Sequence, residues 1–385
     1  MLKDQIILRI PGPTPIPPSV SRALTQPMVG HRDRQVSERI KNLVPRLRPL
    51  FGTEKNDVLI VAASGTSGLE AAAVNLTDEQ EEVLVLVTGA FGDRFRKILE
   101  AYRLQVHAIE TKWGEAVSPE QVKEMLITHP GIKVVFATHS ETSTGVLNPI
   151  KEIAQVVHEH SDALIAVDGV SSIGGAEMRM DEWKVDLVVT GSQKALMLPP
   201  GLALIAVGER GWKKISENKR PRFYLDLLKY KKSLGEDTVP FTPAVSHLFA
   251  LDQSLTLIED EGVPEVLKRH QLMMKMTRAG VLAMNLPLLV EDERFASPTV
   301  TAVIPDDFTP SSFRTIMNKE FNIVFASGQG ELKDRIFRIG HMGYCSPADV
   351  LQYLAAMELA LLKVGHEVTL GAGIKAAQEV YRNDL

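Results

Sequence analysis

The feature that most constrains the fold is a regular alternation of short apolar runs with helical patterns between residues 57 and 207. The apolar runs have the length of buried strands and cover residues 58–63, 82–87, 106–109, 133–138, 163–167, 185–190 and 203–207. Apolar strands that alternate with helices form mostly parallel sheets that are covered on both faces. The sequence therefore predicts an α/β fold with a mostly parallel seven-stranded sheet.

The pattern changes beyond about residue 250, where helices lie beside isolated strands. Long helical stretches are predicted over residues 245–285 and 347–364, and strands over residues 299–304, 323–325 and 335–339. This mixture favours a smaller α+β domain. At the other end, closely spaced prolines between residues 8 and 20 exclude a regular helix. We expect an extended arm over residues 1–20, a large domain over 21–250 and a small domain over 251–385.

Composition limits the classes of function. The chain has 385 residues, a net charge of −5 and no basic run, so we expect no nucleic-acid partner. No apolar stretch approaches the length of a membrane span. A single cysteine, Cys345, excludes a disulfide framework within the chain, and we expect a cytoplasmic protein.

The segment that ends the sixth apolar run carries an unusual lysine. Lys194 follows small polar residues at a strand end and precedes an apolar stretch that closes with Pro199, Pro200 and Gly201. Burial lowers the pKa of a lysine, and a neutral amine forms a Schiff base with an aldehyde. Pyridoxal phosphate is the aldehyde cofactor that uses a lysine in this way. On this segment alone, a lysine without a covalent role fits equally well.

Two further strand ends carry residues suited to a phosphorylated cofactor. Ser64, Gly65 and Thr66 lead from the first strand directly into a helix, whose N-terminal N–H groups favour an anion. An ordinary capped turn is the equal alternative. Asp168 ends the fifth strand and is followed by glycine. A buried carboxylate needs a cation, and a protonated pyridine nitrogen is one, whereas a helix cap is the weaker interpretation.

Three other positions are candidates on residue type and place. Residues 139–145 form a polar cluster after the fourth strand, where Thr142 could reach a cofactor, although a solvated loop fits equally well. Phe91 follows the second strand and could stack on a ring or belong to the core. Arg338 lies among apolar neighbours, where a guanidinium needs a planar anion such as a carboxylate; a structural ion pair is the alternative.

Taken together, these segments resemble the class V, fold-type I pyridoxal-phosphate aminotransferases, close to the alanine–glyoxylate and serine–pyruvate aminotransferases. The likeness runs from Pro11 to Arg338 and rests on five blocks in order. These are Ser-Gly-Thr-Ser-Gly-Leu-Glu-Ala-Ala (64–72), His-Ser-Glu-Thr-Ser-Thr-Gly-Val-Leu (139–147), Val-Asp-Gly-Val-Ser-Ser-Ile-Gly-Gly (167–175), Gly-Ser-Gln-Lys-Ala-Leu (191–196) and Arg-Ile-Gly (338–340).

The resemblance implies a role for each matching residue. Lys194 would carry the cofactor, Asp168 would pair with its pyridine nitrogen, and Val170 and Phe91 would pack on its ring. Phosphate contacts would come from Ser64, Gly65, Thr66 and Gln193 of one subunit and from Thr242 of the other, with Thr142 near the ring oxygen. Arg338 would bind the substrate carboxylate. The family's tyrosine three residues before Thr242 is replaced by Val239, so that phosphate contact is missing.

The resemblance implies a homodimeric transaminase that moves an amino group from alanine or serine to glyoxylate or pyruvate. A ureidoglycine or aminophosphonate aminotransferase on the same scaffold is the alternative, because His31 and Arg32 could add anion contacts. A non-catalytic assembly subunit is a second alternative, which the retention of both Lys194 and Asp168 opposes. A desulfurase is disfavoured because Cys345 follows the arginine strand instead of preceding it.

Overall fold

The large sheet of the computed structural model, which describes residues 6–384, has the predicted seven strands. In spatial order they are β2 (Asp57–Val61), β10 (Ala203–Val207), β9 (Leu187–Gly191), β8 (Leu164–Asp168), β5 (Val134–Thr138), β3 (Glu82–Val87) and β4 (Gln105–Glu110). Only β10 runs against its neighbours, pairing antiparallel with β2 and β9, whereas the other pairs are parallel. The predicted mostly parallel α/β sheet is therefore confirmed.

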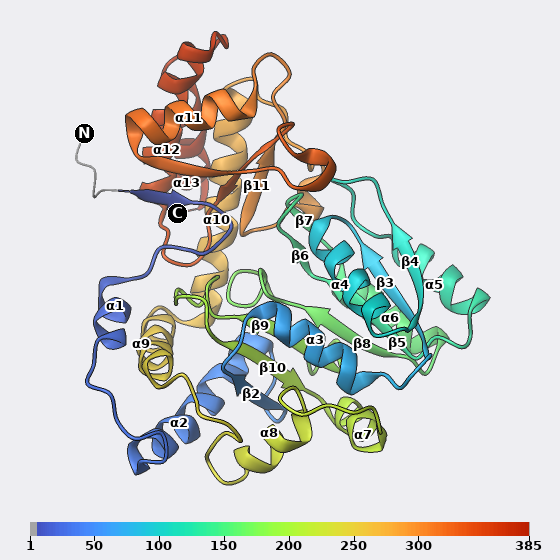
Figure 1. The fold of residues 1–385 in the computed structure, drawn as a ribbon. Helices are drawn as coiled ribbons and strands as arrows, with labels where there is room; N and C mark the ends of the chain where they lie inside the picture. The colour runs from blue at the N-terminus through green and yellow to red at the C-terminus, as the bar shows by residue number, and fades with distance from the viewer. Residues whose placement is uncertain (1–5, 385) are drawn as a thin grey trace.

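Except for the edge strand β4, which is only partly buried, the strands of this sheet bury both of their faces. In β3, Leu84 and Leu86 belong to one apolar cluster, and Val83 and Val85 belong to the other. The first face is covered by α2 (Arg34–Phe51), α5 (Pro119–Thr128), α6 (Ile150–His160) and α9 (Val245–Glu261). The second is covered by α3 (Gly65–Leu76), α4 (Ala90–Ala101), α7 (Glu209–Glu217) and α8 (Leu227–Leu234). The result is a three-layer arrangement, visible in Figure 1.

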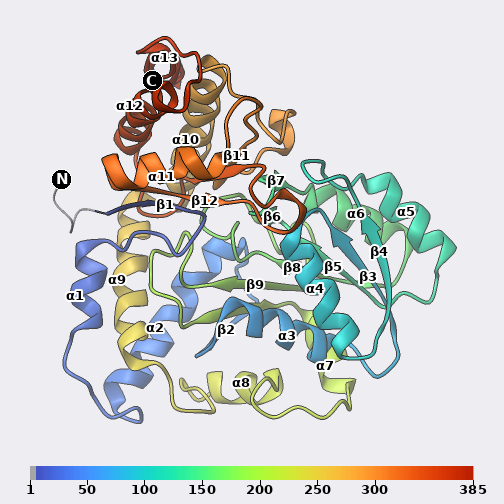
Figure 2. The ribbon, with the colours of Figure 1, turned by 45° about the horizontal axis from the view of Figure 1, so that its top comes forward.

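A second sheet lies beyond the large one, with its own helices (Figure 2). Its strands follow the order β1 (Ile7–Arg9), β12 (Ile323–Ser327), β13 (Phe337–Gly340) and β11 (Val300–Val303). Its helices are α10 (Val263–Ala283), α11 (Pro310–Phe321), α12 (Pro347–Val364) and α13 (Ala372–Asp384). They enclose a separate apolar core. The predicted strands and helices of the C-terminal part are present, with shifts of one to three residues at their ends.

The N-terminal segment differs in detail from the extended arm expected over residues 1–20. Residues 1–5 lie outside the described range. Ile7–Arg9 forms β1, which pairs parallel with β12 of the distant second sheet. Helix α1 (Pro18–Leu24) then begins inside the predicted arm, with proline at its first position, where the missing N–H costs nothing. The proposed domain boundaries at residues 20 and 250 stay predictions.

Some short elements escaped the sequence pattern. Residues 139–145, expected as a polar cluster, contain β6 (Ser140–Glu141) and the turn of a small hairpin that β7 (Val146–Leu147) completes. The side chains of residues 139–144 are buried, so a solvated loop is the wrong interpretation of this segment. Two 3₁₀ turns, η1 (Glu293–Phe295) and η2 (Gly330–Leu332), complete the elements. Within residues 6–384, no helix is both long and apolar enough to cross a bilayer.

Candidate active site

Lys194 lies in the loop that follows β9, and its side chain is almost completely buried. The N-terminal segment holds it in place: its ammonium donates a hydrogen bond to the carbonyl of Pro11, and its own carbonyl accepts one from Thr14 Oγ1 at 2.9 Å. Gly12 has a φ of +112°, which favours glycine, and a Cβ atom there would come within 2.7–2.9 Å of the lysine side chain. Burial, followed by the charge of Arg338, lowers the pKa of Lys194 to about 8.

Asp168 is the last residue of β8 and is 4% exposed. Its Oδ1 accepts a hydrogen bond of 2.9 Å from the backbone N–H of Val170. Burial raises its pKa to about 6, an effect that the charge of Glu141 adds to and Lys194 and Arg94 oppose. No cation of residues 6–384 lies within ion-pair distance of this carboxylate. A buried acid without a cation is the expected partner for a positively charged ring nitrogen.

The residues predicted to bind phosphate meet at the start of α3. Ser64 caps the helix, and its Oγ accepts a hydrogen bond of 3.3 Å from the N–H of Ser67. Gly65 and Thr66 supply the first N–H groups, which have no acceptor inside a helix. Gly65 packs against Val170, because a Cβ there would approach the valine methyl to 3.0 Å. Nearby, the buried Oε1 of Gln193 has no hydrogen-bond partner within residues 6–384.

Glu141 is the strongest feature of the site that the sequence interpretation missed. Its side chain is fully buried and accepts hydrogen bonds from the N–H groups of Phe91 (3.0 Å) and Gly92 (2.9 Å). It accepts two more from the N–H and Oγ of Ser143, at 3.1 and 2.6 Å. Burial raises its pKa, and these donors oppose the rise. The sequence signal that could have indicated Glu141 is a carboxylate directly before a turn rich in threonine and serine. The N-terminus of a helix, here α4, attracts a negative charge.

Phe91 opens α4 and is partly buried, and Arg94 lies over its ring. The guanidinium carbon of Arg94 is 4.7 Å from the ring centroid, a cation–π contact. Arg94 is exposed, and its charge lowers the pKa of both Lys194 and Asp168. The sequence analysis did not predict Arg94, because this residue lies far in sequence from the segments that carry Asp168 and Lys194.

Arg338 connects the two sheets. It lies in β13 between β11 and β12, where its Nε donates to the carbonyl of Ser327 at 2.9 Å. Its Nη1 donates to the carbonyl of Thr142, in the turn between β6 and β7, at 2.7 Å. Burial lowers its pKa to about 10. No carboxylate of the described residues forms an ion pair with it, so the predicted alternative of a structural ion pair does not apply within this range.

Thr242 lines a surface hollow that none of the residues around Lys194 lines. It is exposed and lines this hollow of about 370 Å³ together with His31, Arg32 and residues 238–243. That hollow includes Val239, which stands where the family has tyrosine, and none of the residues described above. The structure therefore groups Thr242 with the two candidate anion-binding residues of the N-terminal part.

Comparison with known proteins identifies the family. The profile described as Aminotransferase class-V matches residues 8–337, most of the chain. The chain belongs to the class-V aminotransferase family. It is 44% identical to an uncharacterized aminotransferase of Methanocaldococcus jannaschii, over 97% of both chains. It is also 41% identical to a protein of Synechococcus sp. named as the small subunit of a soluble hydrogenase, over 98% of this chain and 99% of that one.

Solved structures agree with this assignment. The crystal structure of pyridoxamine–pyruvate aminotransferase from Mesorhizobium loti superimposes with a TM-score of 0.95 at 34% identity, over 99% of this chain and 98% of that chain. As a class-V member with this fold-type I architecture, the chain is a pyridoxal-phosphate-dependent aminotransferase.

The residues present fit pyridoxal phosphate. Asp168 is a buried carboxylate without a cation, and Gln193 Oε1 is buried without a partner. Lys194 has the lowered pKa that a nucleophilic amine requires. The N-terminus of α3 supplies donors for a phosphate. We call Lys194, Asp168, Glu141 and Arg338, with the start of α3, the strand-end site.

Proposed function

We propose that this aminotransferase uses a small amino acid, alanine or serine, as donor and glyoxylate or pyruvate as acceptor. The observation that carries the proposal is the single buried guanidinium of the strand-end site. Arg338 is fixed by two backbone carbonyls and keeps no carboxylate partner in the described chain. One buried planar donor matches one substrate carboxylate. A relative from Methylorubrum extorquens, 32% identical, is named serine–glyoxylate aminotransferase.

In this proposal each residue has a defined task. Lys194 holds the cofactor and, once released, moves a proton from the donor's α carbon, for which a pKa near 8 is suitable. Asp168 keeps the ring nitrogen protonated, and Ser64, Gly65, Thr66 and Gln193 hold the phosphate. When bound, pyridoxal phosphate supplies the aldehyde that accepts the amino group and a ring that takes up electrons. Arg338 orients the donor through its carboxylate.

Two groups supply the packing and electrostatics of this arrangement. Val170 and Phe91 would lie against the ring, and Thr142 near its oxygen. Glu141 fixes the start of α4 and thereby the position of Phe91, since it accepts hydrogen bonds from the backbone N–H groups of Phe91 and Gly92. Cys345 takes no part: burial raises the pKa of its thiol to about 11, and the thiol form is a poor nucleophile.

A second candidate donor is favoured by Arg94. This exposed cation beside Phe91 could bind the side-chain carboxylate of aspartate. A relative from Paracoccus denitrificans, 33% identical, is named L-aspartate–glyoxylate aminotransferase. Ureidoglycine and aminophosphonates are further donors to test. Each carries polar groups in addition to a single carboxylate that Arg338 could bind.

Half-reaction spectroscopy tests the donor. The holoenzyme is mixed with alanine, serine, aspartate, glutamate, ureidoglycine or an aminophosphonate, and the loss of the cofactor's long-wavelength absorbance is followed. Alanine and serine should convert the cofactor fastest, and glyoxylate or pyruvate should restore it. Replacing Arg94 by Gln should leave these rates within about threefold. Faster conversion by aspartate that is lost in Arg94→Gln would overturn the small-donor proposal and support the second candidate.

We also propose a homodimer with shared active sites, in which the hollow of His31, Arg32 and Thr242 faces the partner's cofactor phosphate. The proposal is supported by the exposure of Thr242 and by its place in a hollow that none of the predicted phosphate-binding residues of its own chain lines. Sedimentation at assay concentration should give a dimer, and a fully active monomer would contradict it.

A further inference from the structure

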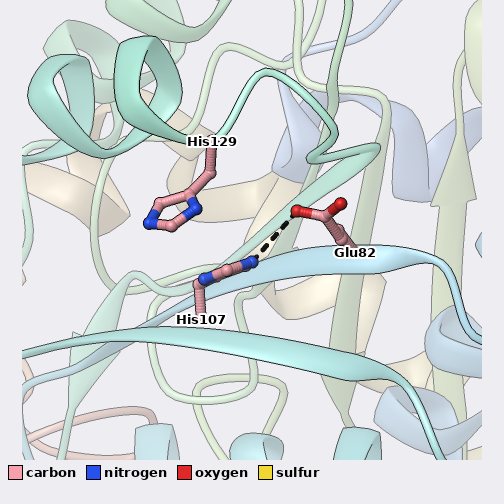
Figure 3. A group of neighbouring side chains, drawn as sticks. All are labelled: Glu82, His107 and His129. Atoms are coloured by element: carbon pink, nitrogen blue, oxygen red, sulfur yellow. Dashed lines mark hydrogen bonds and ion pairs between the residues drawn. The ribbon is translucent and has the colours of Figure 1, made fainter.

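A second polar cluster lies at the opposite end of the large sheet. Glu82 is the first residue of β3, His107 lies on the edge strand β4, and His129 directly follows α5. Figure 3 shows the side chains of Glu82 and His107 directed at one another and the ring of His129 above them. We call these three residues the histidine cluster.

The ligand atoms of the cluster already converge. Nε2 of His107 is 3.1 Å from Oε2 of Glu82, and the two imidazole rings lie 4.1 Å apart at an angle of 32°. One nitrogen or oxygen from each of the three residues falls within 4.8 Å of the others. All three side chains are partly buried, so solvent and small ions reach them.

The backbone determines this convergence. In the parallel register Glu82 pairs with Gln105 and Leu84 with His107, so Glu82 and His107 lie on the same face of the sheet. A turn through Pro130 and Gly131 follows His129, closed by the N–H of Ile132 donating to the carbonyl of His129 at 3.2 Å.

Gly131 in that turn leaves the space that the Glu82 carboxylate occupies. A Cβ atom at this position would clash with Glu82 Oε1. The N–H of Lys133 donates to the carbonyl of Glu82 at 2.9 Å, which fastens the end of the turn to β3. The carboxylate and His129 are therefore held on adjoining pieces of backbone.

We propose that the histidine cluster binds one divalent first-row transition cation, of which Zn²⁺ is the test case. Two imidazoles and a carboxylate are a donor set that suits such cations. Ligands about 2.0–2.2 Å from a tetrahedral zinc lie roughly 3.4 Å apart, close to the separation that Glu82 and His107 already have. His129 needs to approach by at most about 1.4 Å, which side-chain rotation supplies, and water takes the fourth position.

His129 distinguishes this proposal from a simple hydrogen-bonded pair. Within the described part of the chain, neither of its ring nitrogens has a hydrogen-bond partner in the protein, so its lone pair is available. The hydrogen bond between Glu82 and His107 gives each of these two side chains a partner but does not involve His129. A cation bound by all three would join β3, β4 and α5, and would stabilise an edge strand that has a neighbour on one side only.

The site is separate from the catalytic proposal. Glu82 and Val87 are the two ends of β3, about 16 Å apart at roughly 3.3 Å per residue. The residues that lead into the strand-end site follow Val87. The cation therefore has a structural role, and loss of the site should leave transamination unchanged.

The test uses the full-length holoenzyme without an affinity tag, treated with chelator and then dialysed against Zn²⁺ in a buffer free of amino acids. Metal analysis should find one zinc per chain, and Co²⁺ should give the visible absorption bands of a tetrahedral site. His107→Asn/His129→Asn should reduce the zinc content at least tenfold. His160→Asn, at an exposed histidine that ends α6, is the matched control and should bind as the wild type does.

Thermal unfolding separates binding from misfolding. Zn²⁺ should raise the unfolding temperature of the wild type and not that of the double variant, whereas the two should unfold at similar temperatures in chelator. If the double variant does not fold, the single change His129→Asn serves, since that ring makes no hydrogen bond with residues 6–384. Wild-type protein that retains less than about one-fifth of an equivalent of zinc, or variants that keep the metal, would overturn the proposal.

Discussion

The two ends of the large sheet carry polar clusters that differ in their contact with water. At the carboxyl ends of the strands, Lys194, Asp168, Glu141 and Arg338 are almost completely buried, and the pKa of each is shifted by that burial. At the amino ends, Glu82, His107 and His129 are only partly buried.

The difference comes from what covers each end. The second sheet and the N-terminal segment close over the carboxyl ends, through the contacts of Arg338 with Thr142 and of Lys194 with Pro11 and Thr14. Removing water penalises charged forms and brings the pKa of an amine into the range where it transfers protons near neutral pH. The side chains at the amino ends stay partly accessible to solvent. In our two proposals, the carboxyl ends of the sheet carry the chemistry and the amino ends bind a cation.

The largest expected effect is at Lys194. Replacing it by Ala should lower the rate of transamination at least ~10⁴-fold, the upper range for loss of a positioned base, because covalent attachment is lost as well. Borohydride should fix the cofactor to Lys194 in the wild type and to no residue in the variant, as peptide mapping will show. Label on another lysine would show that the cofactor does not attach at the carboxyl ends of the strands through Lys194.

Asp168→Ala should reduce the rate constant for transamination by about 10²–10³-fold, typical of losing a key electrostatic group. The cofactor should remain bound, because the start of α3 and Gln193 are unchanged. Asp168→Asn keeps the shape without the charge and should be impaired to a similar degree. Near-normal kcat in either variant would show that the buried carboxylate has no electrostatic role.

Arg338→Lys should raise the donor KM and lower kcat, with kcat/KM falling about 10- to 100-fold, the equivalent of one or two charge-assisted hydrogen bonds. A lysine cannot reproduce the planar fork that binds a carboxylate. Steady-state kinetics with alanine measure this, and Arg382→Lys, at an exposed position of α13, is the control. An unchanged KM would remove Arg338 from substrate binding.

The smallest expected effect is a change in the pH dependence of cofactor uptake, which compares the buried Lys194 with the partly exposed Glu82. Lys194 has its pKa lowered from 10.5 to about 8, so its amine is protonated below pH 8 and neutral above it. Only the neutral amine attacks an aldehyde, so cofactor uptake by the apoenzyme should quicken about tenfold per pH unit up to pH 8 and then level off. Stopped-flow absorbance measures the rate, and Glu82→Gln should leave the profile unchanged. A rate that keeps rising to pH 10 would show an unshifted lysine.

Local sequence was enough to predict the large sheet and to place several candidate site residues at its edge. The apolar runs of β3, β5 and β8 predict buried parallel strands, because a strand covered on both faces is apolar almost throughout. Asp168 and Lys194 could be predicted to lie at a buried edge, because one is the last residue of an apolar strand and the other comes three residues after the end of one. The Ser64 cap at the start of α3 was likewise encoded within a few residues.

Only the tertiary structure decided which distant groups share a site. The sequence could not show that Glu141 meets the N-terminus of α4, or that Arg338 of the second sheet donates to Thr142, because these contacts join elements far apart in the chain. The strand β1 depends on pairing with β12 more than 300 residues away. The same holds for His129. A histidine that follows a helix does not suggest metal binding until the strand register is seen to place Glu82 and His107 next to it. Periodicity is a property of neighbours in sequence, whereas burial and charge pairing are properties of neighbours in space.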